Sequence, residues 1–306
     1  MNSSTFNFKN PIIRLAVLAS LAFAAYCGIL QRLQPEVNAF QNQWVKNYAV
    51  AERFIYGSGD YPAVIVGTSL STHLNQDQLG NGVYNLSFSG GSVLAGLHII
   101  QKSRHIPKTL FIETNIAEHE LDKSMIDNLF VPFLWKIKSR VLALQYTYQP
   151  INLLLSALKS HHEKNRVQRL ADIQNPKILN ASLQHFLKES RNPGGLEKKS
   201  EFTDLQALVK QLKSMGTRIV FFEMPVHGDI LSSPKYAKRR QILKERFPGD
   251  EFHFLPPSAG SSYATSDGVH LLPKSACRFT LVMNRIINHP AATDASPETL
   301  NPKNAC

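Results

Sequence analysis

The chain has 306 residues, with 34 Lys and Arg against 23 Asp and Glu and a formal net charge of +11. Because 43% of the residues are apolar and 9% are aromatic, the sequence can bury a core, which excludes global disorder. Three cysteines are too few for a disulfide-stapled miniprotein, and Cys27, Cys277 and Cys306 lack zinc-ligand spacing, so neither a metal nor a cofactor is expected. The charge alone fits nucleic acid, an acidic glycan or anionic lipid.

The first thirty residues have the pattern of an export segment. Residues 15–30 carry no charge, and Lys9 and Arg14 precede this apolar run. We predict a signal anchor over residues 1–30 whose basic flank keeps the N-terminus cytoplasmic. Two alternatives stay open: cleavage near residues 22–24 (Ala-Phe-Ala), which would release a soluble protein, and a buried core helix.

An anchor of this kind sets the compartment of the remaining chain. We expect a single-pass protein of the cytoplasmic (inner) membrane, with its main domain on the periplasmic, extracytoplasmic side. Export argues against nucleic acid as a partner, although the exported part is still basic. Cys277 and Cys306 would lie outside the cytoplasm, where a disulfide between them is possible.

Beyond the anchor, residues 31–60 predict a juxtamembrane linker helix, since apolar side chains recur at helical spacing before the stop at residues 57–59. Short apolar runs then alternate with segments of helical spacing, over a domain that we place at residues 61–288. This alternation is typical of a parallel α/β sheet with helices on both faces. We predict strands over 63–67, 83–88, 109–113, 218–223 and 252–255, and helices over 91–103, 205–215 and 274–287.

One stretch interrupts the alternation. Residues 117–200 read as a helical insertion after the third strand, rich in aromatic and basic residues. Three roles stay open for it: a subdomain on the sheet edge, a lid over the site, or an amphipathic face on the membrane. Residues 289–306 predict a disordered tail.

Polar residues follow several of the predicted strands, where parallel sheets form their sites. Ser69 follows the first strand, Gly90 the second and Asn115 the third, and Asp267 and His270 precede the last helix. Since a serine hydroxyl is a weak nucleophile until a base takes its proton, His270 can activate Ser69 while Asp267 fixes the imidazole tautomer. The Ser69 and Gly90 N–H groups and the Asn115 amide could hold the oxyanion of an acyl-transfer reaction.

At these positions the sequence resembles the SGNH (GDSL-type) hydrolase family. Its four blocks correspond here to Gly67-Thr68-Ser69-Leu70, to Asn85-Leu86-Ser87-Phe88-Ser89-Gly90, to Glu113-Thr114-Asn115-Ile116 and to Asp267-Gly268-Val269-His270. The resemblance implies a flavodoxin-like three-layer αβα fold, a Ser69–His270–Asp267 catalytic triad, and Gly90 and Asn115 as oxyanion donors. Thr68 replaces the aspartate of the first block, as in membrane-anchored relatives that modify envelope glycans. The third block has Glu113 and Ile116 in place of its glycine and aspartate.

Ordinary structural roles compete with these assignments. Ser69 could cap a helix, Asp267 and His270 could form a surface turn, and Gly90 and Asn115 could shape loops.

His227 follows the fourth strand and is a candidate substrate contact, or else a hydrogen-bonded loop histidine. The nucleophile elbow of α/β-hydrolases fits worse, because Ser71 stands where that motif needs a glycine.

Two functional hypotheses follow. In the first, the protein is an envelope-facing serine esterase or O-acyltransferase acting on acyl esters, in the first place acetyl esters, of a cell-surface glycan. In the second, it is a catalytically inactive scaffold or glycan-binding component of an envelope polysaccharide assembly, with partners in envelope biosynthesis. A Ser69 hydroxyl far from the His270 ring would favour the second.

Overall fold

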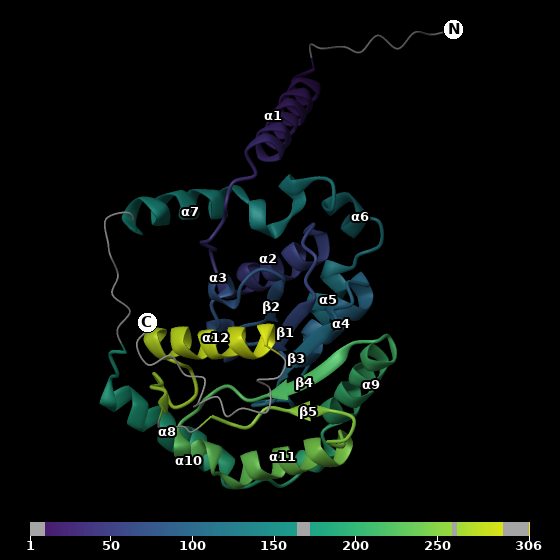
Figure 1. Ribbon diagram of the computed structural model, residues 1–306. Helices are drawn as coiled ribbons and strands as arrows, with labels where there is room; N and C mark the ends of the chain where they lie inside the picture. Colours follow the sequence, from purple (N-terminus) through teal and green to yellow (C-terminus); the bar gives the residue numbers. More distant parts are fainter. Residues whose placement is uncertain (1–9, 164–171, 259–261, 290–305) are drawn as a thin grey trace. The chain divides into compact units, whose positions relative to one another are not determined.

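A computed structural model describes residues 10–163, 172–258, 262–289 and 306 (Figure 1). The chain forms two compact units. The N-terminal unit combines residues 1–56 with 130–167, and the sheet unit combines residues 57–129 with 168–306. The predicted insertion at 117–200 is therefore divided between the two units, and most of the predicted tail lies outside the described residues.

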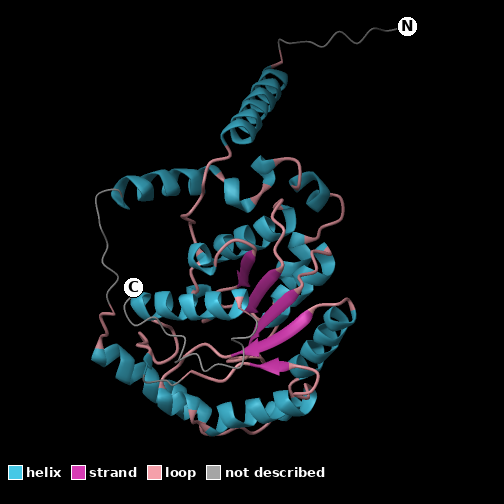
Figure 2. Ribbon diagram, in the orientation of Figure 1, coloured by secondary structure: helices cyan, strands magenta, loops and turns pink. Residues whose placement is uncertain are grey.

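The sheet unit is built on five parallel strands in the order β2-β1-β3-β4-β5 (Figure 2). This order is that of flavodoxin-like sheets, so the predicted α/β class is confirmed. The chain adds β2 on one side of β1 and the later strands, from β3 on, on the other side. This topological switch point between β1 and β3 predicts a site at their carboxyl ends. The strands are β1 (Ala63–Gly67), β2 (Val83–Ser87), β3 (Thr109–Glu113), β4 (Arg218–Phe222) and β5 (His253–Phe254).

Helices cover both faces of this sheet because its strands are apolar on both sides. On one face, Ile65 and Phe111 belong to a core shared with Phe279 of α12 (Pro273–Asn288). On the other, Val66 packs so closely on α4 (Val93–Ser103) that Gly96 has no room for a side chain. Also on this face, α9 (Ser200–Ser214) packs against α4 and β4.

Shorter elements complete the sheet unit. Among them, α8 belongs to the predicted insertion and packs against α10 and α11. These elements are η1 (Ser71–His73), α3 (Gln76–Leu79), α5 (Lys123–Leu129), α8 (Pro176–Ser190), η4 (Leu196–Lys198), α10 (Gly228–Leu231) and α11 (Pro234–Arg246).

The N-terminal unit is helical. A buried ion pair joins Lys138 to Glu52 at 2.8 Å, and the Tyr146 N–H donates to the other Glu52 oxygen at 2.6 Å. The Tyr146 ring stacks on Tyr48 with centroids 4.4 Å apart. The unit contains α1 (Pro11–Leu33), α2 (Gln43–Tyr56), α6 (Leu134–Lys138), η2 (Leu142–Leu144), η3 (Tyr146–Tyr148) and α7 (Pro150–Glu163).

The predicted linker helix over residues 31–60 is shorter in the structure. Gln34 ends α1 in a left-handed conformation, and Pro35 has no N–H to continue the helix. The next helix, α2, begins only at Gln43.

The predicted anchor corresponds to α1. It has 23 residues, and its most apolar window has a mean hydropathy of 2.0 with none of it buried. At 1.5 Å per residue the helix is about 34 Å long, enough to cross a hydrocarbon core of about 30 Å. Length and composition therefore suit a membrane span, a property that cleaved signal sequences share.

Candidate active site

Ser69 and His270 meet at the carboxyl end of the sheet, although 201 residues separate them in the chain. Ser69 lies just beyond β1, and its Oγ is 3.0 Å from Nε2 of His270. On the other side of the ring, Nδ1 of His270 lies 2.6 Å from Oδ2 of Asp267. With the Nδ1 proton directed at Asp267, Nε2 can accept the Ser69 proton. Ser69 and Asp267, the two ends of this relay of hydrogen bonds, are partly exposed, so a substrate can reach them.

A tight turn holds Asp267 beneath the histidine. Its second oxygen, Oδ1, accepts the backbone N–H groups of Val269 at 3.0 Å and His270 at 2.8 Å. Burial raises the pKa of Asp267, but the hydrogen bonds from the His270 ring and from these two N–H groups outweigh it and lower the pKa to about 2. The side chain is therefore a carboxylate at any ordinary assay pH.

Two backbone N–H groups are available beside Ser69. Among the described residues, neither the Ser69 N–H nor the Gly90 N–H has a hydrogen-bond partner. Strands β1 and β2 pair up to Gly67 and Ser87, and the Phe88 N–H donates to the Gly67 carbonyl at 3.2 Å, so both loops leave the same edge. Gly90 has a φ of +67°, the left-handed region that favours glycine.

Asn115 is engaged elsewhere. Its side chain is buried and pairs with the backbone of Met224, donating to the carbonyl at 2.9 Å and accepting from the N–H at 2.7 Å. These contacts tie the loop after β3 to the loop after β4, and the role of Asn115 as an oxyanion donor stays a prediction.

A buried carboxylate holds the turn that carries Ser69. Oε2 of Glu113 accepts the Thr68 N–H at 2.8 Å and the Ser71 hydroxyl at 2.6 Å, and the Thr68 hydroxyl donates to Oε1 at 2.9 Å. Burial raises the pKa of Glu113, while the hydrogen bonds from Ser71 and Thr68 act in the opposite direction. In the sequence, Glu113 stands out only as a departure from the family pattern, and the signal for its role is an acidic residue at the end of a buried strand.

Glu113 also explains Gly67. A Cβ at residue 67 would lie 1.8 Å from the Ser71 Oγ and 2.7 Å from Oε2 of Glu113. Only glycine leaves room for the carboxylate to pass beneath the turn.

The rim of the site is made by loops after β4 and by α8. The His227 N–H donates to the Gly268 carbonyl at 2.8 Å, and the His227 ring lies at the start of α10 beside Asp229. A side chain at residue 268 would meet Ile230 at 3.1 Å and Leu183 of α8 at 3.5 Å. His227 thus borders the Asp267–His270 turn through its backbone.

His73 is a second neighbour that sequence reasoning did not assign. Its ring centroid lies 5.6 Å from that of His270, and the side chain is exposed. Its spacing of one turn from Ser69 was the only signal.

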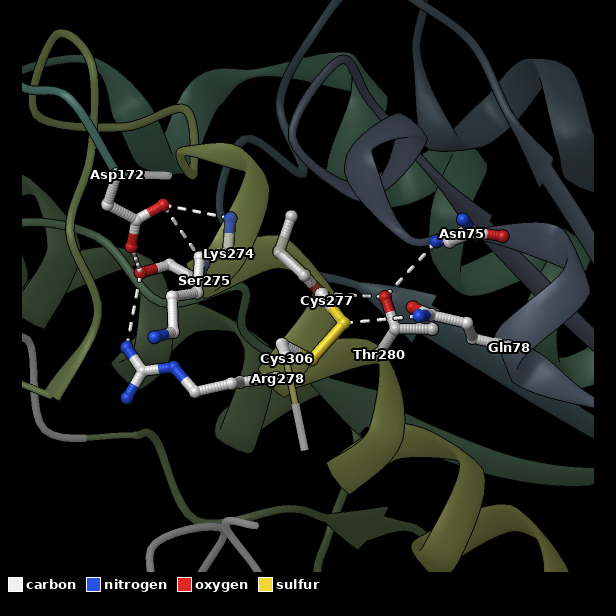
Figure 3. The surroundings of a disulfide bond; sticks show 10 residues. Asn75, Gln78, Asp172, Lys274, Ser275, Cys277, Arg278, Thr280 and Cys306 are labelled. Atoms are coloured by element: carbon white, nitrogen blue, oxygen red, sulfur yellow. Dashed lines mark hydrogen bonds between the residues drawn. A yellow bond between two sulfur atoms is a disulfide. The ribbon is translucent and has the colours of Figure 1, made fainter. Parts of the chain in front are cut away.

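Helix α12 begins three residues after His270 and is fixed at its N-terminus and along its length (Figure 3). Asp172 accepts hydrogen bonds from the Lys274 N–H at 2.8 Å and the Ser275 hydroxyl at 2.6 Å. Farther along, Cys277 forms a disulfide with Cys306, and the Thr280 hydroxyl accepts the Asn75 N–H at 3.1 Å. The helix therefore links the segment after Ser69 to the segment after His270.

In the part of the chain that the structure describes, no group of three or more His, Cys, Asp or Glu side chains is placed to hold a metal ion. The chemistry of the cluster is that of a serine, a base and a carboxylate.

Comparison with known proteins gives little more. No family model and no curated protein matches the chain. A solved structure from Bacteroides fragilis NCTC 9343, provisionally described as an acylhydrolase, is 13% identical with a TM-score of 0.41 and covers 83% of this chain and 99% of its own. Another, from Streptococcus pneumonia and provisionally described as a platelet activating factor, is 12% identical with a TM-score of 0.41 and covers 80% and 92%. Similarity this low carries no functional argument, so function has to follow from the side chains.

Proposed function

We propose that the protein is a serine esterase or O-acyltransferase that acts on acyl esters, most simply acetyl esters, of a cell-surface glycan. Ser69 is the nucleophile, His270 the general base and Asp267 the residue that orients the base. The observation that carries the proposal is the relay itself, with Ser69 3.0 Å from His270 and His270 2.6 Å from Asp267.

In the acylation step, Oγ of Ser69 attacks the ester carbonyl and its proton passes to Nε2 of His270. The negative charge that develops on the carbonyl oxygen is stabilised by the N–H groups of Ser69 and Gly90. Removing one such donor typically costs about 10²–10³ in rate. The intermediate collapses when the alcohol leaves with the proton that His270 holds, and the acyl group stays on Ser69.

In the deacylation step, His270 takes a proton from the acceptor while the acceptor oxygen attacks the acyl carbonyl. The bond from the carbonyl carbon to Oγ of Ser69 then breaks, and His270 returns the proton to Oγ. A water molecule gives a carboxylic acid and makes the protein an esterase. A sugar hydroxyl gives a new ester and makes it an acyltransferase. The same residues serve both reactions, because only the acceptor differs.

The proposed location is the outer side of the cytoplasmic membrane, with α1 as the anchor. The disulfide between Cys277 and Cys306 supports this side, since disulfides persist in oxidising compartments. The choice of a glycan substrate rests on this location and on the family resemblance, and partners in envelope biosynthesis remain part of the proposal.

Labelling with a fluorophosphonate probe tests the nucleophile without knowledge of the substrate. We expect the full-length protein to be labelled, with the phosphonate found on the peptide that contains Ser69. Ser69→Ala and His270→Ala should abolish labelling. Ser89→Ala, which removes a hydroxyl next to Gly90, should leave it intact.

Equal labelling of the wild-type protein and Ser69→Ala would overturn the triad and favour the glycan-binding alternative. If Ser69 is labelled, turnover of an acetyl ester with and without an added oligosaccharide separates the two reactions. Acetyl groups recovered on the sugar indicate a transferase, and acetate alone indicates an esterase.

A further inference from the structure

Helix α7 of the N-terminal unit buries polar side chains and exposes apolar ones, the reverse of a surface helix in a water-soluble protein. Its buried face is polar: Asn152 is fully buried and Ser156 is 5% exposed. Ile151, Leu154 and Leu158 lie at helical spacing on the opposite face and are 42%, 55% and 56% exposed. An apolar stripe that faces outward requires an apolar environment.

The polar face of α7 fixes the helix to the chain that leaves α1. Oγ of Ser156 accepts the N–H groups of Asn38 and Ala39 at 3.1 and 3.0 Å, and Oδ1 of Asn152 accepts the Gln41 N–H at 3.2 Å. The donating N–H groups begin at Asn38, five residues after the last residue of α1, Leu33. The hydrogen bonds of Asn152 and Ser156 therefore hold α7 close to the end of α1.

Direct contacts bring α7 still closer to α1. The Tyr26 hydroxyl, on α1, donates to the carbonyl of Tyr148, just before α7 begins. A groove of about 460 Å³ is lined by Ile29 and Leu33 of α1 and by Leu153 of α7. Within this unit, α7 runs across the end of α1 rather than along it (Figure 1).

From this arrangement we propose that the face of Ile151, Leu154 and Leu158 lies in the headgroup region of the bilayer that α1 crosses, as an interfacial helix. The inference rests on α1 being retained as an anchor. A helix long enough to span the hydrocarbon core ends at the membrane surface, and α7 is tied to that end. Interfacial helices insert their apolar face at this depth.

The segment before α7 also combines exposed apolar residues with basic residues, as expected at a membrane surface. Phe133 is exposed and has a φ of +70°, and Leu134 is also exposed. Lys136 and Arg140 lie on the same segment with exposed side chains. Basic groups beside exposed aromatic and aliphatic residues suit an anionic lipid surface.

Fluorescence quenching in membranes tests the proposal. The chain has two tryptophans, so Trp44→Phe and Trp135→Phe give a background without indole. Leu154→Trp is added to the full-length protein, which is reconstituted alone into vesicles of phosphatidylcholine and phosphatidylglycerol. With lipids brominated near the headgroup end of the acyl chains, we expect the emission to fall by about half or more relative to unbrominated lipids.

Two matched variants interpret the result. Lys210→Trp, at an exposed position of α9 in the sheet unit, should not be quenched, and Leu21→Trp, within α1, should be quenched by bromines near the bilayer centre. Quenching at residue 21 but not at residue 154 overturns the inference, and leaves a protein partner as the occupant of the face. No quenching at residue 21 overturns the anchor, and the inference with it. Ser69 labelling of each variant reports folding and tests the proposed reaction separately.

Discussion

The Ser71 hydroxyl donates a hydrogen bond of 2.6 Å to Glu113, whose carboxylate is completely buried. Through this bond and those to Thr68, the end of β3 sets the shape of the turn after β1. The position of the Ser69 hydroxyl relative to His270 therefore depends on a residue that does not touch the substrate.

We predict losses of different size for two substitutions of Glu113. Glu113→Ala removes the common acceptor, and each buried donor left without a partner costs about 1–3 kcal/mol, so both stability and Ser69 labelling should fall. Glu113→Gln keeps an oxygen for the Thr68 N–H and the Ser71 hydroxyl and should lose far less labelling. Equal losses in the two variants would contradict the role of Glu113 as an acceptor.

Glu113 also predicts a dependence of stability on pH. Burial raises its pKa in the folded state above the ordinary value of 4.5, so the folded protein holds this proton more tightly than the unfolded chain. The contribution to stability is then largest below pH 4.5 and declines as pH rises through the raised pKa. Urea unfolding at several pH values should show the wild-type protein losing stability relative to Glu113→Gln over this interval. A difference that stays constant with pH would exclude the raised pKa.

Asp267→Asn tests the orientation of the base. The amide keeps an oxygen for the Val269 and His270 N–H groups, but its NH₂ group would face Nδ1 and favour the tautomer with the proton on Nε2, which cannot accept the Ser69 proton. We expect kcat for an acetyl ester to fall by about 10³–10⁴ with little change in KM. Because the pKa of Asp267 is lowered to about 2, loss of activity between pH 7 and pH 4 should not follow its protonation. An unchanged kcat in Asp267→Asn would refute its role.

The buried ion pair of the N-terminal unit predicts a strong coupling. Lys138→Met leaves the Glu52 carboxylate buried without its partner and should destabilise the protein by about 3–5 kcal/mol. Adding Glu52→Gln to Lys138→Met removes the stranded charge and should restore part of the loss. A double-mutant cycle by urea unfolding measures the coupling, and additive effects of the two substitutions would contradict a direct pair.

The disulfide predicts sensitivity to reducing agents. It joins residues 29 positions apart, and loop-closure entropy for this length corresponds to about 3–4 kcal/mol. Reduction, Cys277→Ser and Cys306→Ser should lower the unfolding midpoint by similar amounts. Cys27→Ser, which removes the one free cysteine of the described residues, should leave the effect of reductant unchanged. An unfolding midpoint that does not change with reductant would argue against the disulfide.

The sheet was predictable because its strands are continuous apolar runs. The prediction for β1 and β3 matches their observed bounds, since both lie buried between two layers of helices. Helix ends were less accurate: α9 begins at Ser200, five residues before the predicted start, because its first turn is mostly polar and Phe202 is its single apolar residue.

The N-terminal unit could not be read from local patterns. It depends on contacts such as that between Glu52 and Lys138, which lie 86 residues apart. In the same way, the sequence placed Ser69 after the first strand and Asp267 and His270 before the last helix, but the engagement of Asn115 by Met224 depends on a pairing across 109 residues.

The 201-residue separation of Ser69 and His270 also bears on how the protein folds. Contacts between distant parts of a chain form late, because the intervening loop must first be ordered. A chain in which β1 to β3 have folded already holds the turn of Ser69 in place through the bonds of Thr68 and Ser71 to Glu113, yet it has no base until α12 docks beside α3. Nascent or proteolytically clipped forms of the sheet unit should therefore be inert toward esters, and reactivity of Ser69 during refolding should follow the slowest structural phase.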